Sequence, residues 1–410
     1  MTDTFTTNRG SLPDIAGANV AGRTVLIRAD LNVPMKNGEI TDATRIARFA
    51  PTVADLASRG AAVAVMTHLG RPDGEPNPCF STEPIARELE QQLGRPVTFA
   101  KDCVGDAAEA ATGNLSAGQV VMLENLRFHR GEGENSRNFA MRLSVNGDLY
   151  VNDAFSCAHR AHASTHAITE LMPSYAGPAL LGEVAALETA LLAPERPVVA
   201  IVGGAKVSTK IAVLKNLVQK FDAVIICGGM ANTFLFAEGF QMGKSLHEAD
   251  QVATVREIKT LAAAAGCEIC LPMDAVIARE FKAGAANQTV PVDACPQDAM
   301  ILDAGPASLS RFRTLLGNAR TVLWNGPLGA FETPPFDKAT VELARFAAVR
   351  ARSGDLTCVA GGGDTVAALN AAGVTDDFTY VSTAGGAFLE WLEGKTLPGI
   401  AALMSAPEAA

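Results

Sequence analysis

The sequence predicts an α/β protein of two Rossmann-like lobes, each a parallel sheet with helices on both faces, joined by a helical hinge. Short apolar runs recur along the chain and alternate with segments of helical spacing, such as Ile211–Val218. Because these runs are apolar throughout, they are typical of parallel strands buried on both faces. At 410 residues the chain is also longer than one ordinary domain.

Nine runs are predicted as strands, and one helix separates the two lobes. The strands are Thr24–Arg28, Ala62–Thr67, Val120–Leu123, Leu149–Asn152, Val198–Val202, Ala223–Cys227, Thr321–Trp324, Thr357–Ala360 and Tyr380–Ser382. The helix is expected over Glu183–Leu192, and a proline-rich stretch ending at Pro197 leads into the next strand. We therefore expect an N-terminal domain over 1–182, a connecting helix or hinge over 183–197, and a C-terminal domain over 198–392.

The composition excludes several classes of protein. The formal net charge of −10 argues against nucleic acid or an anionic membrane as the main partner. Met1–Gly10 is threonine-rich and is followed by no apolar run, so no secretion signal is expected. The eight cysteines have no regular spacing, and Cys267 and Cys270 are expected as reduced thiols on or beside a buried strand. These features predict a cytoplasmic protein.

The residues that follow the predicted strands differ between the two halves. Nine of eleven lysines lie after residue 190, whereas fourteen of twenty-three arginines and five of six histidines lie before it. Ligands of open α/β sheets bind beyond the carboxyl ends of the strands. We therefore expect an arginine and histidine site in the first half and a glycine, lysine and aspartate site in the second.

Two glycine-rich turns of the second half suit phosphate. Gly203-Gly204-Ala205-Lys206 follows a strand and precedes a helix, an arrangement that fits either phosphate binding or an ordinary turn with solvated lysines. Gly361-Gly362-Gly363-Asp364-Thr365 has the same position. Asp364 could be a simple helix cap, but a cap does not need three preceding glycines, so we favour a nucleotide phosphate there.

In the first half, arginines and histidines stand at or just past several strand ends. They are Arg28, Arg45, His68, Arg71, Arg127, Arg160 and His162. Arginine suits phosphate and carboxylate because its planar guanidinium donates two parallel hydrogen bonds. A single arginine is more often a surface ion pair, but several at successive strand ends of an acidic protein favour an anion site.

Three other motifs are set aside. Gly239–Ser245 resembles a Walker A loop but has one residue too few between its glycines. No G-x-G-x-x-G pattern opens a βαβ unit, which weakens a dinucleotide dehydrogenase. The histidines of Asp153–His162 lack carboxylates or thiolates in metal-binding register, so we prefer anion binding there.

Taken in order, the motifs closely resemble those of the phosphoglycerate kinase family. They are Arg28–Pro34, Thr41–Ile46, Thr67–Pro72, Leu123–Phe128, Asp153–His162, Gly203–Val207, Trp324–Glu332 and Gly361–Thr365, which span nearly the whole chain. Ala29, Leu31, Ser156, Cys157 and Thr209 depart from the usual family residues, none at a position with an expected charge role.

The resemblance implies a site residue by residue. The N-terminal lobe would bind 3-phosphoglycerate or 1,3-bisphosphoglycerate through Asp30, Asn32, Arg45, His68, Leu69, Gly70, Arg71, Arg127 and Arg160. The C-terminal lobe would bind ATP or ADP through Lys206, Lys210, Glu332, Gly362, Gly363, Asp364 and Thr365, with Asp364 also reaching Mg²⁺. The family's C-terminal tail folds onto the first domain, which places 393–410 there, and a monomer is expected.

The implied activity is reversible phosphoryl transfer between 1,3-bisphosphoglycerate and ADP. The two nucleophiles, a carboxylate in one direction and an ADP phosphate in the other, are already ionised and need no general base. Catalysis must therefore neutralise charge on the moving phosphoryl group, and Arg45 and Lys206 are the residues expected to do so. Two alternatives stay open on the residues alone, a dehydrogenase and a non-catalytic two-lobed protein that binds anionic metabolites. The second would not explain the glycine, lysine and aspartate motifs.

Overall fold

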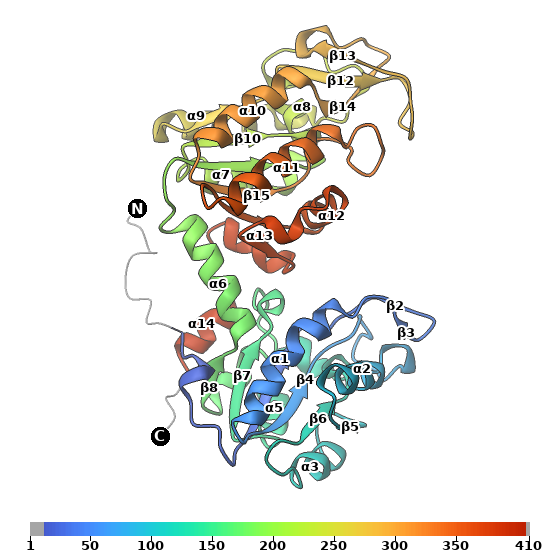
Figure 1. Cartoon of the computed structure of the whole chain (residues 1–410), viewed down its shortest axis with the longest axis vertical. Helices are drawn as coiled ribbons and strands as arrows, with labels where there is room; N and C mark the ends of the chain where they lie inside the picture. Colours follow the sequence, from blue (N-terminus) through green and yellow to red (C-terminus); the bar gives the residue numbers. More distant parts are fainter. Residues whose placement is uncertain (1–11, 407–410) are drawn as a thin grey trace. The chain divides into compact units, whose positions relative to one another are not determined.

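The computed structural model describes residues 12–406, and contacts within the chain divide it into two units. Unit 1 runs up to Val184 and also takes in the segment from Thr396 onward. Unit 2 comprises Ala185–Lys395. Met1–Gly10, for which no secretion signal is expected, lies outside the described residues. The predicted fold class is confirmed, because each unit is built on a six-stranded sheet of parallel strands with packed helices (Figure 1).

Unit 1 is a parallel sheet in the strand order β5-β6-β4-β1-β7-β8. Its strands are β1 (Thr24–Ala29), β4 (Ala62–Met66), β5 (Val97–Ala100), β6 (Val120–Leu123), β7 (Leu149–Asp153) and β8 (Ser174–Ala176), with a hairpin of β2 (Met35–Lys36) and β3 (Glu39–Ile40). Its helices are α1 (Thr44–Ser58), α2 (Glu83–Leu93), α3 (Asp106–Thr112), α4 (Arg130–Gly133), α5 (Arg137–Ser144) and α14 (Pro398–Met404). The central strands β1, β4, β6 and β7 are almost wholly buried, as their continuous apolar sequences predict.

Unit 2 repeats this architecture in the order β11-β10-β9-β15-β16-β17. Its parallel strands are β9 (Val198–Val202), β10 (Ala223–Ile226), β11 (Glu268–Cys270), β15 (Thr321–Asn325), β16 (Thr357–Gly361) and β17 (Tyr380–Ser382). Its helices are α7 (Ile211–Leu217), α8 (Gly228–Ala237), α9 (Val252–Ala265), α10 (Pro306–Asn318), α11 (Lys338–Arg352), α12 (Gly363–Ala372) and α13 (Gly386–Leu392).

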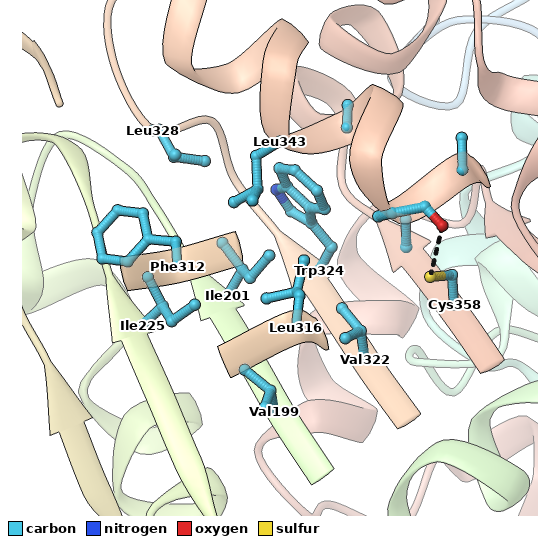
Figure 2. Packing of buried hydrophobic residues seen from close by; sticks show 14 of the residues in the cluster. Val199, Ile201, Ile225, Phe312, Leu316, Val322, Trp324, Leu328, Leu343 and Cys358 are labelled. Carbon is cyan, nitrogen blue, oxygen red and sulfur yellow. Dashed lines mark hydrogen bonds between the residues drawn. The ribbon is translucent and has the colours of Figure 1, made fainter. Parts of the chain in front are cut away.

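The core of unit 2 lies between its sheet and helices α10 and α11. Figure 2 shows Trp324 of β15 among Leu316 of α10 and Leu343 of α11, with Ile201 of the neighbouring strand close by. Alternate residues of each strand enter this cluster, and the residues between them are equally buried on the opposite face. Both faces are therefore covered, which explains why these strands carry no polar alternation.

A small antiparallel sheet of unit 2 is absent from the sequence prediction. It consists of β12 (Asp274–Ala278) between β13 (Asn287–Pro291) and β14 (Met300–Ala304). Most of β13 is exposed and polar, so no apolar run marks it. Together with α8, this sheet encloses a separate hydrophobic cluster that includes Leu235 and Ile277.

Helix α6 (Pro178–Leu191) connects the units and begins earlier than the predicted Glu183. Proline is tolerated in the first turn of a helix because its missing N–H would have no partner there. The next two N–H groups are capped by a distant side chain, since Asp153 Oδ1 accepts from the N–H groups of Ala179 (2.7 Å) and Leu180 (3.1 Å). Such a cap cannot be recognised from the local sequence.

The last described helix returns to the first unit. Gly399, in the first turn of α14, donates its N–H to the carbonyl of Ala158 at 2.9 Å. A Cβ at position 399 would lie 3.0 Å from Ala158 Cα, so glycine permits this close approach.

All eight cysteines are unpaired; Cys267 is buried directly before β11, and Cys270 is buried at its end. Among the described residues, no helix is both long enough and apolar enough to span a membrane.

Candidate functional site

In unit 1 the predicted site residues gather where β1, β4, β6 and β7 end. Since these strands are parallel neighbours, the segments that follow them meet at one edge of the sheet. Asp30 and Asn32 follow β1, and His68 and Gly70 follow β4. Arg127 follows β6 in a short 3₁₀ turn.

Asp30 and Arg45 form an ion pair at this edge. Arg45 stands in the first turn of α1, and its guanidinium donates to Asp30 Oδ2. Ser156 Oγ donates to the same carboxylate oxygen, which links the segment after β7 to the segment after β1. About a third of the Arg45 side chain remains exposed, so it can still reach a ligand (35% against 16% for Asp30).

His68 is buried against a wholly buried arginine. Arg28, the fifth residue of β1, lies with one guanidinium nitrogen 3.0 Å from His68 Nδ1. Burial lowers the pKa of His68 well below its usual value, and the charges of Arg28, Arg127 and Arg45 lower it further. His68 is therefore neutral at physiological pH.

Asn32, Gly70 and Arg127 form a second linked set. Asn32 Oδ1 accepts from the N–H of Gly70 at 2.9 Å, and Arg127 donates to the Gly70 carbonyl at 2.7 Å. Gly70 has a φ of 62°, which favours glycine. Leu69 is buried, and its carbonyl accepts from the Asn125 side chain at 2.7 Å. The Asn125 side chain thus holds the backbone of this loop at Leu69.

Arg71 and Arg160 are exposed and extend the positive surface of this edge. Burial lowers the pKa of both Arg127 and His162, and the charge of Arg160 lowers both slightly further. The predicted set of unit 1 is thus brought together. Sequence reasoning did not find the hydrogen bond of Ser156 to Asp30, nor those of Ser164 with Arg28 and Glu132, because each joins residues far apart in the chain.

In unit 2 the loops after β9, β10 and β15 touch backbone to backbone. A Cβ at Gly203 would overlap the carbonyl of Pro327, and one at Gly326 would overlap the carbonyl of Gly203. A Cβ at Gly228 would lie 2.9 Å from the carbonyl of Gly204. Packing alone therefore explains several of the paired glycines.

The two predicted lysines of this region differ. Lys206 is exposed at the end of the glycine loop. Lys210 is half-buried, and its Nζ donates to Asn325 Oδ1 (2.6 Å) and to the carbonyl of Gly203 (2.7 Å). Burial lowers the pKa of Lys210 to about 8, against the opposing effect of Asp364.

The motif Gly361–Thr365 lies at the start of α12, between a strand and a helix as predicted. Gly361 packs against Phe388, where a Cβ would lie 2.7 Å from the ring, and Gly362 has a φ of 99°. Gly363 has no atom within 4 Å of its hypothetical Cβ, so neither packing nor backbone geometry requires glycine there. The first N–H groups of the helix have no partner within it. Thr365 Oγ1 accepts from the N–H of Gly326 at 2.7 Å and retains its own proton to donate.

A cavity of about 630 Å³ lies beside these loops. Glu332 and Asp364 line it, whereas Lys206, Lys210, Gly362, Gly363 and Thr365 are not among its lining residues. One wall is apolar and belongs to α8, the small antiparallel sheet and the 3₁₀ turn that follows β13; it includes Leu235, Ala275, Val292, Met300 and Ile301. Sequence reasoning missed this wall, and the structure adds the exposed side chains of Phe281 and Leu246 at the cavity.

Two groupings of metal-binding residue types occur in the part of the chain that the structure describes. One is Asp30, His68 and Cys157. There Arg45 pairs with Asp30 and Arg28 with His68, and both arginines repel a cation. In the other, Asp102 and His129 already form a hydrogen bond of 2.7 Å beside Cys103. For Mg²⁺, exposed Asp364 is a suitable oxygen ligand at the cavity.

These two sites can be compared with known proteins. The family model of phosphoglycerate kinase matches residues 15–395. The chain belongs to the phosphoglycerate kinase family. It is 58% identical to the phosphoglycerate kinase of Chelativorans sp. (strain BNC1) over 385 residues, which is 94% of this chain and 97% of that protein. It is also 58% identical to that of Sinorhizobium medicae (strain WSM419) over 382 residues, 93% of this chain and 96% of that protein.

Solved structures of phosphoglycerate kinases have the same fold. The structure from Coxiella burnetii matches with a TM-score of 0.89 at 41% identity and covers 95% of this chain and 98% of that chain. The one from Pyrococcus horikoshii OT3 matches with a TM-score of 0.78 at 30% identity, with the same coverage. The chain is therefore an enzyme of the kinase class, and the phosphoglycerate kinase reaction is its activity.

Proposed function

We propose that unit 1 binds 3-phosphoglycerate or 1,3-bisphosphoglycerate and that unit 2 binds ADP or ATP with Mg²⁺. In this division of the chain, the phosphoglycerate domain is the predicted 1–182 with 393–410 and the nucleotide domain is 198–392. The observation that carries the assignment is the cluster of arginines at one sheet edge of unit 1. A doubly charged phosphate and a carboxylate need several permanent positive charges.

On the phosphoglycerate side, each group has a proposed partner. Asp30 and Asn32 accept or donate hydrogen bonds at the substrate hydroxyl. Arg71, Arg127 and Arg160 hold the phosphate and carboxyl ends, together with neutral His68 and the loop of Leu69 and Gly70. Arg45 is shared between Asp30 and the group being transferred. This role is supported by its partial exposure beside its less exposed partner Asp30.

On the nucleotide side, the phosphates lie at the start of α12 and the base and ribose lie in the adjoining cavity. The N–H groups around Gly362, Gly363 and Thr365 bind phosphate oxygens, and the helix dipole favours their negative charge. Lys206 and Lys210 add positive charge, and Glu332 accepts from the ribose. The apolar cavity wall suits a planar base.

Mg²⁺ fits the oxygen chemistry of Asp364, which would hold it together with the nucleotide phosphates. The ion supplies charge neutralisation and orientation for those phosphates. Asp364 has the position such a role needs, exposed in the first turn of α12 and lining the cavity.

The transfer itself needs no proton movement. A terminal oxygen of ADP attacks the acyl phosphorus of 1,3-bisphosphoglycerate, the bond between phosphorus and the carboxyl oxygen breaks, and that oxygen leaves as a carboxylate. The attacking ADP oxygen is ionised at neutral pH, and so is the 3-phosphoglycerate carboxylate that attacks in the reverse direction. Catalysis therefore rests on positioning and on charge stabilisation by Arg45 and Lys206. Because the two ligands are assigned to different units, closure of the units about the segment 183–197 is part of the proposal.

Small-angle X-ray scattering tests the closure. We expect the radius of gyration to decrease when 3-phosphoglycerate and a non-hydrolysable MgATP analogue are both present, and to change less with either alone. An unchanged radius in the ternary state contradicts hinge closure.

A coupled assay tests the activity and separates it from the alternatives. The chain is supplied with 3-phosphoglycerate and MgATP, and an added dehydrogenase reports product through NADH oxidation. We expect signal only with both substrates and Mg²⁺. A dehydrogenase would act on the nicotinamide without the coupling enzyme, and a binding protein would give no turnover.

A monomer in the cytoplasm completes the proposal. The cytoplasmic location is supported by eight unpaired cysteines, which suit a reducing compartment. Light scattering coupled to gel filtration should give a mass near 42.7 kDa, and twice that value contradicts the monomer.

A further inference from the structure

A chain of buried polar groups lies behind the phosphoglycerate-binding edge of unit 1. Arg28, Glu132 and Ser164 are all at most 1% exposed. Ser164 lies far from Arg28 in sequence, yet Arg28 Nε donates to Ser164 Oγ at 3.0 Å. Ser164 Oγ in turn donates to Glu132 Oε1 at 2.6 Å, and the Ser164 N–H donates to Glu132 Oε2 at 3.0 Å.

This chain holds the guanidinium of Arg28 in one orientation. Besides Ser164, its nitrogens donate to the carbonyl of Ala29 and approach His68 Nδ1 at 3.0 Å and Cys157 Sγ at 3.6 Å. A buried guanidinium is costly unless its charge is balanced and its N–H groups are bonded. Glu132 supplies a balancing negative charge through the Ser164 hydroxyl that both groups bond; burial lowers the pKa of Arg28, and the Glu132 carboxylate is among the groups that raise it.

The orientation of Arg28 determines the protonation of His68. A guanidinium has only donors, so the His68 nitrogen that faces it must accept. Nδ1 therefore carries the lone pair, and the ring proton of neutral His68 resides on Nε2. The charged and titratable groups that face His68 are Arg28, Arg45, Arg127, His162 and Cys157. The arginines and His162 all disfavour the imidazolium.

We propose that Glu132 and Ser164 are positioning residues for the phosphoglycerate site, which fix Arg28 so that His68 presents a neutral Nε2–H donor to the bound anion. The proposal rests on the proposed function, in which His68 contacts the phosphoglycerate. Neither Glu132 nor Ser164 touches the substrate, and both act through Arg28.

The sign of the effect distinguishes positioning from simple electrostatics. Glu132 is a negative charge close to an anion site, so its removal would tighten phosphoglycerate binding if only its charge mattered. If Glu132 positions Arg28, its removal weakens binding instead, although the site gains net positive charge. A purely structural role would alter stability and leave both the KM and the His68 tautomer of the folded enzyme unchanged.

The experiment compares Glu132→Gln, Ser164→Ala and the control Ser174→Ala with the wild-type full-length chain. Ser174 is also buried in unit 1, but its hydroxyl donates to the Met172 carbonyl and has no hydrogen bond to Arg28, Glu132 or Ser164. Long-range ¹H–¹⁵N spectra of the histidine rings, with His68 assigned through His68→Gln, report the tautomer between pH 6 and 8. Steady-state kinetics report the KM for 3-phosphoglycerate.

We expect the wild type and Ser174→Ala to show the Nε2–H tautomer of His68 without titration over this pH range. Glu132→Gln and Ser164→Ala should shift the ring toward a mixture of tautomers and raise the KM roughly tenfold, with a smaller change in kcat. Ser164→Ala preserves every charge, so it decides the question if Glu132→Gln does not fold.

A wild-type tautomer with unchanged KM in folded Ser164→Ala overturns the proposal, and so does a lower KM in Glu132→Gln. If His68→Gln leaves the KM for 3-phosphoglycerate unchanged, the assignment of His68 as a substrate contact fails. The dependence of the His68 tautomer on Glu132 and Ser164 is then still decided by the spectra. The two failures are thus separable.

Discussion

The two units share one architecture but offer an anion different groups at the carboxyl ends of their strands. Unit 1 presents arginine side chains that are fixed by partners such as Asp30 and the Gly70 carbonyl. Unit 2 presents the free backbone N–H groups of a helix start, an exposed lysine and a half-buried lysine. The arginine charges at the edge of unit 1 do not change in the physiological pH range, whereas the positive charge at the loops of unit 2 comes from lysine. The fold therefore fixes where a ligand binds, and the loops decide how its charge is met.

Substitution of Arg45 should give the largest effect. Arg45→Ala removes the charge expected to stabilise the moving phosphoryl group and leaves Asp30 without its ion pair. We expect kcat to fall by roughly 10³-fold or more, as for other arginines that stabilise phosphoryl transfer. The coupled assay measures it, and Arg48→Ala, an exposed arginine one turn further along α1, is the control. Near-normal turnover in Arg45→Ala would contradict the claim that arginine side chains of unit 1 stabilise the charge of the transferred group.

Lys206 tests the same role in unit 2. Lys206→Ala should lower kcat by roughly 10²- to 10³-fold, because one charged donor to the transferring group is lost. Its exposure means that folding should be unaffected, which circular dichroism checks. Lys215→Ala, which removes an ion pair with Glu257 elsewhere in unit 2, should retain full activity. Equal loss in both variants contradicts a specific role.

Gly363 tests recognition by backbone. Its Cβ would meet no protein atom and its conformation suits other residues, so Gly363→Ala should preserve stability. If phosphate oxygens approach this helix start, the added methyl should raise the KM for MgADP roughly tenfold while the KM for 3-phosphoglycerate stays constant. Gly361→Ala is the contrasting variant, since its Cβ would strike Phe388 and lower the melting temperature instead. An unchanged KM for MgADP in Gly363→Ala argues against phosphate at this position.

The pH dependence should give the smallest effect and the clearest contrast between the units. Lys210 has a pKa lowered to about 8, so its ammonium is charged below pH 8 and loses its proton as the pH rises through that value. Because the nucleotide is anionic, kcat/KM for MgADP should fall several-fold between pH 7.5 and 9.5. The KM for 3-phosphoglycerate should stay constant over the same interval, since arginine keeps its charge.

Lys210→Arg is the matched variant for this profile. Its permanent charge should abolish the fall above pH 8, even if the altered hydrogen bonds to Asn325 lower activity at pH 7.5. A flat wild-type profile up to pH 9.5 would show that Lys210 does not act through its charge.

The sequence predicted nine of the twelve strands of the two parallel sheets, because these nine carry continuous apolar runs, and it did not include the edge strands β5, β8 and β11. Every predicted run is a strand of the structure, including those of β1 and β9, since burial on both faces demands continuous apolar residues. The strand β13 was missed because its residues are polar and exposed. The start of α6 was misplaced because Asp153 caps it from outside the local sequence.

For the candidate site, residue types at strand ends were predictable and their partners were not. Arginine after a strand suggests an anion, and the sheet then brings such residues together. That Arg28 is wholly buried and bonded to Ser164 depends on the packing of distant segments. The apolar wall of the unit 2 cavity likewise depends on the pairing of β12 and β14 in a small sheet that the sequence prediction did not include.

The return of α14 to unit 1 has a consequence for the order in which the protein is made. Gly399 supports Ala158, which directly follows the Ser156 and Cys157 turn beside Asp30. During translation, all of unit 2 leaves the ribosome before residue 399 does. Unit 1 is therefore discontinuous along the chain, and its site edge gains the support of Gly399 only after the whole of unit 2 has been synthesised.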